Sequence, residues 1–106
     1  IQGYAGHCQS VPDYAERRAQ SHAALGVLGS VRDALLDAGF ACPMVTGGGT
    51  GTHDFDHEPN VLTELQVGSY VFSDVIYDGA VMARPGSESA RGYARHLHRA
   101  SLRPER

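Results

Sequence analysis

The chain has 106 residues, 42% of them hydrophobic and 20% charged, which indicates one globular domain or part of one. A net charge of −3 predicts no attraction to nucleic acid, and no apolar run approaches the length of about 20 residues that a membrane span needs. The first residues lack the features of a signal peptide, so we expect a cytoplasmic protein. They also lack an initiator Met, which predicts that Ile1 lies inside a longer protein.

The basic residues are all arginine, and the chain contains no lysine. Chemistry that needs a lysine to form a Schiff base therefore cannot be completed by this chain alone. Cys8 and Cys42 could pair if they were close in space, but two free thiols are the expectation.

Residues 1–10 are predicted to form a short strand that runs into a loop. The apolar spacing from Tyr14 to Ala38 predicts a helix, which Asp13 begins and Gly39 ends, with Arg17 and Arg18 on its surface. Residues 41–46 form a short apolar run bounded by glycine, which is typical of a buried strand.

Beyond the glycine-rich run, residues 53–60 are polar and predicted to be irregular, and residues 61–67 alternate as a strand does. Residues 70–77 fit either a strand or a short helical segment, and residues 88–102 fit either a solvated helix or part of a mobile tail. This order predicts a parallel α/β fold, either a doubly wound sheet or a piece of a (β/α)8 barrel. A whole barrel takes roughly 250 residues, more than this chain has.

The run from Gly47 to Thr52, called the glycine loop below, follows the predicted strand at 41–46. Glycine lets backbone N–H groups approach an anion closely, and Thr50 and Thr52 could add hydroxyl donors. The loop lacks the lysine of a nucleotide P-loop and does not match the dinucleotide-binding fingerprint. It predicts either a phosphate site or only a flexible turn.

Three further groups could belong to a site. Tyr4, His7 and Gln9 follow the first predicted strand and could stack on or hydrogen-bond to a flat ligand, or be an ordinary strand-end Tyr and an exposed His. Residues 53–58 have the composition of a metal site but not its spacing, so a solvated loop without metal is expected. Glu64 and Gln66 would point to one face of a strand, in a ligand-supporting or a structural role.

Taken together, three segments in this order and at this spacing resemble the D-threonine aldolase and D-serine dehydratase group of pyridoxal-phosphate enzymes. They are Gly3-Tyr4-x-Gly6-His7-x-Gln9, then Val45-Thr46-Gly47-Gly48-Gly49-Thr50-Gly51-Thr52, then Thr63-Glu64-Leu65-Gln66-x-Gly68-Ser69-Tyr70-Val71-Phe72-x-Asp74-x-x-Tyr77. Each segment alone is weak evidence, whereas the combination is specific.

The resemblance implies an alanine-racemase-like (β/α)8 barrel of fold type III. Residues 1–78 would be its C-terminal part, the last third to half, and the arginine-rich residues 79–106 do not match the family. Pyridoxal 5′-phosphate is the implied cofactor, with its phosphate held by Gly48, Gly49, Thr50, Gly51 and Thr52. Tyr4 would lie beside the pyridine ring, and His7 and Gln9 near the pocket.

The implied function is that of a fragment of a lyase acting on D-3-hydroxy amino acids, as an aldolase or a dehydratase. The family's Schiff-base lysine and its divalent-metal ligands lie outside this chain, so the chain carries no catalytic residue and is predicted to be inactive alone, and the whole protein is expected to be a homodimer. One alternative is a non-catalytic pyridoxal-phosphate binder or a remnant. Another is a different phosphate-binding barrel, for a sugar phosphate or a flavin, which explains the glycine loop but not residues 4–9.

Overall fold

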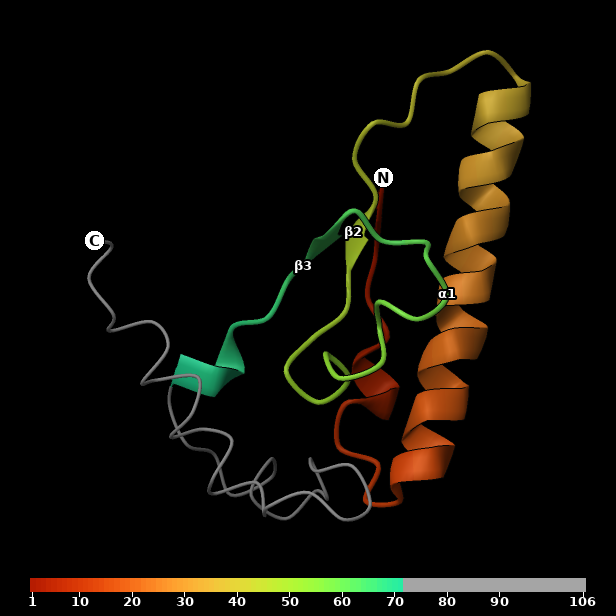
Figure 1. Ribbon diagram of the computed structural model, residues 1–106. Helices are drawn as coiled ribbons and strands as arrows, with labels where there is room; N and C mark the ends of the chain where they lie inside the picture. The colour runs from red at the N-terminus through yellow and green to blue at the C-terminus, as the bar shows by residue number, and fades with distance from the viewer. Residues whose placement is uncertain (72–106) are drawn as a thin grey trace.

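A long helix and three short parallel strands make up the described part of the computed structural model, residues 1–71 (Figure 1). In chain order the elements are β1 (Gln2–Gly3), η1 (Gly6–Cys8), α1 (Tyr14–Asp37), β2 (Thr46–Gly47), β3 (Glu64–Leu65) and η2 (Ser69–Val71). A strand, a helix and a second, parallel strand follow one another, which confirms the predicted α/β class.

The sheet has the order β1-β2-β3, and all of its pairs are parallel. Gln2 pairs with Thr46, and Thr46 pairs with Glu64. Backbone hydrogen bonds extend the pairing on both sides, from the Thr46 N–H to the Ile1 C=O (3.0 Å) and from the Gln66 N–H to the Gly47 C=O (2.8 Å). Because the strands are parallel, the chain leaves β1 and β2 at the same edge of the sheet, where residues 4–9 and the glycine loop begin.

The strands are shorter than the sequence predicts. The run at 41–46 was expected to be a strand, but β2 begins only at Thr46 and continues into Gly47. Pro43 has no N–H to give to a ladder, which works against regular pairing at the start of this run. The predicted strand at 61–67 is reduced to β3, Glu64–Leu65.

Helix α1 ends one residue from its predicted limit and has a defined cap at each end. The Asp13 carboxylate accepts a hydrogen bond from the Glu16 N–H at 2.7 Å. At the other end Gly39 has a φ of 85°, and the N–H groups of Gly39 and Phe40 donate to the C=O groups of Leu36 and Leu35. This is the Schellman arrangement, which confirms the predicted stop at Gly39.

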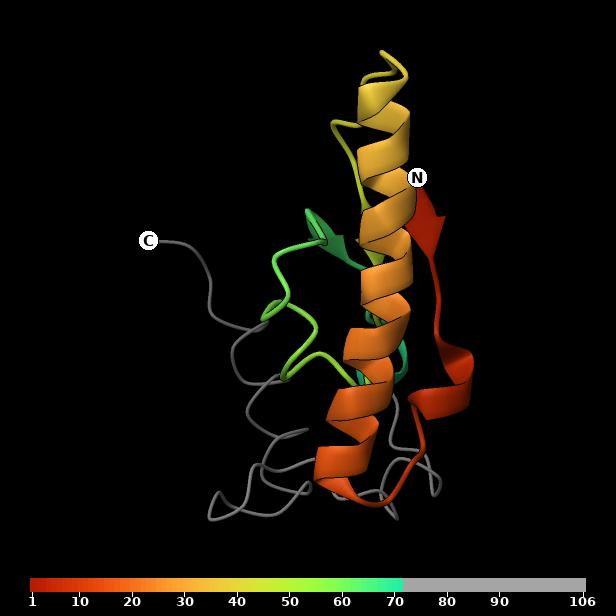
Figure 2. The same cartoon turned by 90° about the vertical axis from the view of Figure 1, so that its right-hand side faces the viewer.

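The core lies between α1 and one face of the sheet, across which the helix runs (Figure 2). It consists of Leu25, Leu28, Val45 and Val61, with Leu62 packed against them. A Cβ on Gly3 would lie 3.0 Å from the side chain of Leu28, and one on Gly29 would lie 3.2 Å from that of Val61. Small residues on both elements therefore let the helix approach the sheet closely.

The prediction that Arg17 lies on the helix surface was wrong, because its side chain is buried. It lies on the face of α1 that also carries Ser21 and Leu25, and that face is turned towards the core. Its guanidinium donates to the C=O of Val11 and lies 5.6 Å from the centre of the Tyr14 ring. Burial lowers the pKa of Arg17 from its ordinary value.

Several predictions concern residues outside the described part. These are the boundary between residues 78 and 79, residues 72–77 of the segment at 70–77, and the helix at 88–102. Residues 70 and 71 belong to η2, a short helical turn. Cys8 and Cys42 are both free thiols, as predicted. Within residues 1–71 no helix is long and apolar enough to cross a membrane.

Candidate functional site

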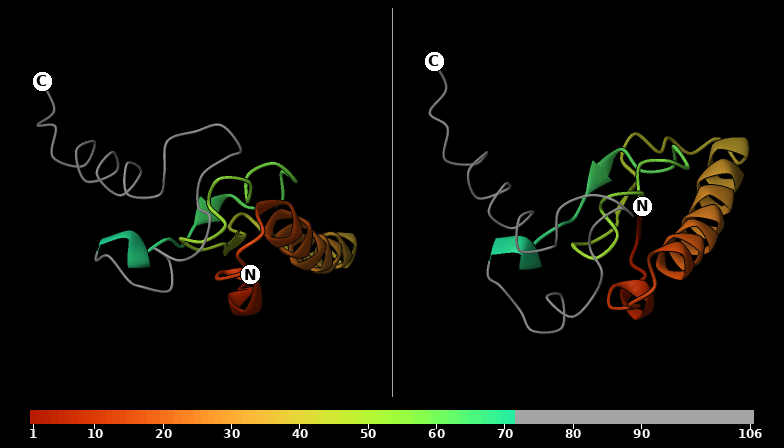
Figure 3. Two further views of the ribbon diagram at one scale, coloured as in Figure 1. Left: turned by 90° about the horizontal axis from the view of Figure 1, so that it is seen from below. Right: turned by 60° about the horizontal axis from the view of Figure 1, so that its bottom comes forward.

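The segments that follow β1 and β2 lie together at one end of the sheet. The η1 turn after β1 is adjacent to the glycine loop after β2 (Figures 1 and 3). The sequence predicted that these two segments share one edge of a parallel sheet, and the strand pairing confirms it.

A chain of buried hydrogen bonds joins η1, the glycine loop and α1. The Gln9 side-chain amide donates from Nε2 to Thr52 Oγ1 (2.9 Å) and accepts at Oε1 from the Gly51 N–H (2.9 Å). Thr52 Oγ1 in turn lies 2.6 Å from Asp56 Oδ2, and Ser21 donates to Asp56 Oδ1 at 2.5 Å. The exposed fractions are 4% for Gln9 and 1% for both Thr52 and Asp56, so the network is shielded from water.

The glycines of the loop are needed for this packing. A Cβ on Gly49 or Gly51 would overlap Gln9, at its side-chain amide and its backbone C=O respectively. Gly48 has a φ of 73°, which disfavours other residues, and a Cβ there would overlap the Asp56 carboxylate. The glycines thus let Gln9 and Asp56 reach the backbone of the loop from two sides.

The loop's polar groups divide into two sets. The N–H groups of Gly49 and Gly51 and the hydroxyl of Thr52 are bonded to Asp56 and Gln9. The hydroxyl of Thr50 is also buried, at 7% residue exposure, but it has no hydrogen-bond partner among the described residues. Buried hydroxyls are ordinarily hydrogen-bonded, so Thr50 is the side chain of this loop that could still donate a hydrogen bond to a bound group.

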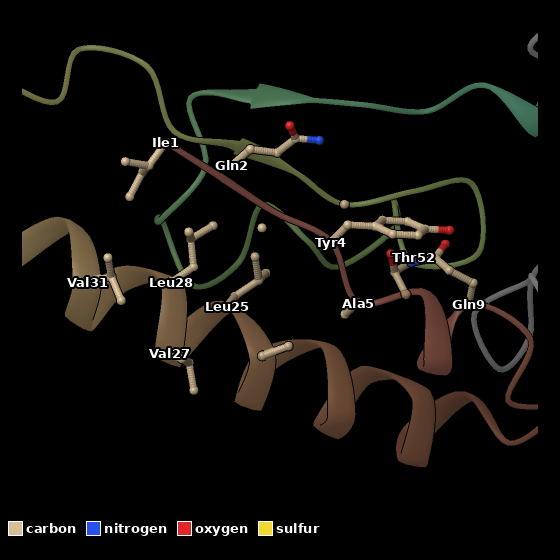
Figure 4. A pocket seen from close by; sticks show the side chains of 13 residues that line it. Ile1, Gln2, Tyr4, Ala5, Gln9, Leu25, Val27, Leu28, Val31 and Thr52 are labelled. Carbon is tan, nitrogen blue, oxygen red and sulfur yellow. Dashed lines mark hydrogen bonds between the residues drawn. The ribbon is translucent and has the colours of Figure 1, made fainter.

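Tyr4 lines a groove of about 730 Å³ that also borders the network (Figure 4). Gln9 and Thr52 lie near Tyr4 at one end of this groove, as Figure 4 shows. Gly48 also lines it, while Val27, Leu28 and Val31 of α1 line its apolar part. Tyr4 is 64% exposed, and a flat ligand could therefore reach its ring. His7 is exposed and does not line this groove.

Asp56 is the member of this buried network that the sequence analysis did not single out. Residues 53–58 were expected to be solvated, and this was wrong for Phe55 and Asp56, which are both buried. A four-residue spacing places Thr52 and Asp56 on one side of a helical turn, as the bond from the Asp56 N–H to the Thr52 C=O (3.0 Å) indicates. That spacing was a signal in the sequence, but nothing there indicated that Ser21 meets the same carboxylate.

Burial and nearby charges shift the pKa values of two groups around this network, Cys8 and Glu58. The Cys8 thiol is fully buried, and burial together with the nearby Asp56 charge raises its pKa. Glu58 accepts a hydrogen bond from Nε of Arg18 in α1, which lowers the pKa of Glu58, and His22 lies 3.3 Å from the same carboxylate. These contacts join the segment after the glycine loop to the helix.

The remaining predicted side chains lie away from the network. Gln66 accepts a hydrogen bond from the Gln2 side chain (2.7 Å), and Glu64 is exposed. Within the described residues no group of three His, Cys, Asp or Glu side chains could hold a metal ion.

Comparison with known proteins supports the family suggested by the three motifs. The chain is 40% identical over 77 residues to a D-threonine aldolase from Arthrobacter sp., a match that covers 73% of this chain and 20% of that enzyme. It is 39% identical over 77 residues to a 3-hydroxy-D-aspartate aldolase from Paracoccus denitrificans, with the same coverage. The chain is a relative of the D-threonine aldolases.

The fold agrees with this relationship. The crystal structure of a D-threonine aldolase from Filomicrobium marinum matches with a TM-score of 0.73 and 38% sequence identity, covering 84% of this chain and 23% of that structure. The chain spans about a fifth of the length of the two aldolases that it matches in sequence. No family model matches the chain.

Proposed function

We propose that this chain is the part of a pyridoxal-phosphate-dependent lyase that binds the phosphate of the cofactor, in an enzyme that acts on D-3-hydroxy amino acids. It would form the later third to half of an alanine-racemase-like barrel. The relationship to aldolases and the parallel strand–helix–strand order support this proposal. The observation that carries it is the buried Thr50 hydroxyl without a described partner, in a glycine loop that follows a parallel strand.

The residues present fit the phosphate-bearing end of such a cofactor. The Thr50 hydroxyl would donate to a phosphate oxygen, with the glycine loop around it and the exposed Tyr4 ring beside the flat part of the ligand. Thr52 would contribute from within the loop, Gln9 would support the loop from the segment after η1, and His7 would lie at the same end of the sheet. When bound, pyridoxal phosphate supplies an electron sink for bond cleavage at the amino acid.

The role of this chain's own residues is therefore to bind and orient. The chain contains no lysine, and its described residues include no metal-binding group. The groups that attach the cofactor and hold the divalent metal would come from other parts of the enzyme, whose homodimeric state stays a prediction.

The test is binding of pyridoxal phosphate to the 106-residue chain, followed by phosphorus NMR or fluorescence, in Thr50→Ala and Thr50→Ser variants. Loss of one hydrogen bond to an anionic group should weaken binding by about tenfold or more in Thr50→Ala, and Thr50→Ser should restore most of it. Ser30→Ala removes an exposed hydroxyl on α1 and is the matched control. Equal affinity of Thr50→Ala and the unaltered chain would contradict the proposal.

The same titrations with other phosphate ligands distinguish a pyridoxal-phosphate site from the site of a different phosphate-binding barrel. Binding of a flavin mononucleotide or a sugar phosphate without binding of pyridoxal phosphate would favour a different phosphate-binding barrel. Inorganic phosphate should compete with pyridoxal phosphate if the glycine loop holds the phosphate group.

A second candidate is a pyridoxal-phosphate binder without turnover. This chain contains no lysine, so by itself it could bind the cofactor but could not form the Schiff base. We expect the isolated chain, supplied with pyridoxal phosphate and a divalent metal, to cleave or dehydrate D-threonine and D-serine no faster than a protein-free blank. Product formation above the blank would contradict this expectation.

A further inference from the structure

We infer that Gln9 is a positioning residue that holds the glycine loop in shape from the protein side and does not itself contact the ligand. The inference rests on the proposed phosphate-binding role of the loop. Gln9 is 4% exposed, and its side-chain amide forms one bond to the backbone of the loop and one to a side chain of the loop. The donors and acceptors of the network explain both why a glutamine suits this position and how its amide group is oriented.

The Asp56 carboxylate fixes which way the hydrogen bonds of the network run. An ionised carboxylate can only accept, and Asp56 accepts from the Ser21 hydroxyl, the Thr52 hydroxyl and, at 3.3 Å, the Gly49 N–H. Thr52 has one hydroxyl proton, and it goes to Asp56 at 2.6 Å rather than to the Gly49 C=O, which is at the long distance of 3.5 Å. Any further partner of the Thr52 oxygen must therefore be a donor.

Gln9 supplies that donor. Its NH2 group faces the Thr52 oxygen, which leaves its amide oxygen to accept from the Gly51 N–H. Of the two amide orientations, only this one satisfies both partners. A side chain at this place needs a donor and an acceptor on one short planar group, which the amide provides and a carboxylate does not.

Gln9 and Asp56 together fix the loop from two sides. Gln9 holds Gly51 and Thr52, while Asp56 holds Gly49 and Thr52, so the backbone around Thr50 is fixed on both sides of that residue. The missing Cβ atoms of Gly49 and Gly51 leave the room that Gln9 fills. A loop held in this way would meet a phosphate with little reorganisation, which favours affinity.

The test compares Gln9→Glu and Gln9→Met with the unaltered chain. Gln9→Glu keeps the size but places an acceptor against the Thr52 oxygen, and Gln9→Met keeps the length without any polar group or charge. Gln20→Glu makes the same change on α1 away from the glycine loop, where the half-buried Gln20 bonds Glu16, and is the matched control.

The first readout is amide hydrogen exchange in the chain without ligand. We expect exchange at Gly49 and Gly51 to rise at least about tenfold in both Gln9 variants and to stay unchanged in Gln20→Glu. Exchange at Leu28, in the core, serves as the internal reference. An equal rise at Leu28 and at Gly51, or no rise at Gly51, would overturn the inference.

The second readout is the affinity for pyridoxal phosphate, which separates this inference from the function on which it rests. A fall in affinity of about tenfold or more together with faster loop exchange supports a positioning role. A fall in affinity with unchanged loop exchange would make Gln9 a direct ligand contact and overturn the inference, while the proposed function stands. If the unaltered chain binds no pyridoxal phosphate but the loop exchanges faster in both variants, the proposed function fails and the positioning role remains.

Discussion

At the scale of single residues, Asp56 joins three parts of the molecule, because its carboxylate accepts hydrogen bonds from α1 and from two positions of the glycine loop. Its loss would leave the Ser21 and Thr52 hydroxyls and the Gly49 N–H without this acceptor in a buried place. Unsatisfied buried donors are costly, more so than the hydrogen bonds themselves are stabilising.

We therefore predict that Asp56→Ala lowers the free energy of unfolding by about 3 kcal/mol. Urea denaturation followed by circular dichroism measures this. Asp37→Ala, at the exposed end of α1, is the control and should change the free energy by less than about 0.5 kcal/mol. A similar small change for both variants would show that the buried network contributes little to stability.

At the scale of elements, α1 was the most accurately predicted part, and its glycines show why packing still matters. A Cβ on Gly26 would have no neighbouring atom within 4 Å, whereas one on Gly29 would lie 3.2 Å from Val61. Both glycines weaken the helix to the same extent by their backbone freedom.

Gly26→Ala is expected to raise the free energy of unfolding by roughly 0.5 to 1 kcal/mol, the helix-propensity difference between Gly and Ala. Gly29→Ala should gain less or be destabilising, because the added methyl group crowds Val61 between helix and sheet. Thermal unfolding of the two variants tests this, and a larger gain for Gly29→Ala would contradict the observed packing.

At the scale of the whole described molecule, the ion pair of Arg18 with Glu58 ties the helix to the segment that follows the glycine loop. The pKa of Glu58 is lowered in the folded state, mainly by the hydrogen bond from Arg18. This pair therefore stabilises the fold at neutral pH, and the stabilisation is lost as the pH falls through the lowered pKa.

Glu58→Gln should consequently lower the thermal unfolding midpoint at pH 7, and the difference from the unaltered chain should shrink as the pH falls below the ordinary pKa of a glutamate and the Glu58 carboxylate becomes protonated. Glu64→Gln, at an exposed position in β3, is the control. A difference between the Glu58 variant and the unaltered chain that does not shrink as the pH is lowered would show that the packing of the side chain, and not its charge, causes the effect.

The sequence by itself determined the features that depend on local pattern: the limits of α1 to within one residue, its start at Asp13 and stop at Gly39, the strand–helix–strand succession and the position of the glycine loop. Backbone conformation and side-chain period are properties of neighbouring residues, and they can be inferred from the chain alone. The combination of three motifs also identified the aldolase family, which the relatives confirm.

Only the tertiary structure decided which groups of the loop are already bonded. Gln9 meets Thr52 across 43 positions of the chain, and Ser21 meets Asp56 across 35. The burial of Arg17 likewise depends on how residues 11–14 turn back over α1. Such contacts depend on how distant segments pack, and no local pattern in the sequence indicates them. They occupy the other polar groups of the glycine loop described above, whereas the Thr50 hydroxyl has no partner among the described residues.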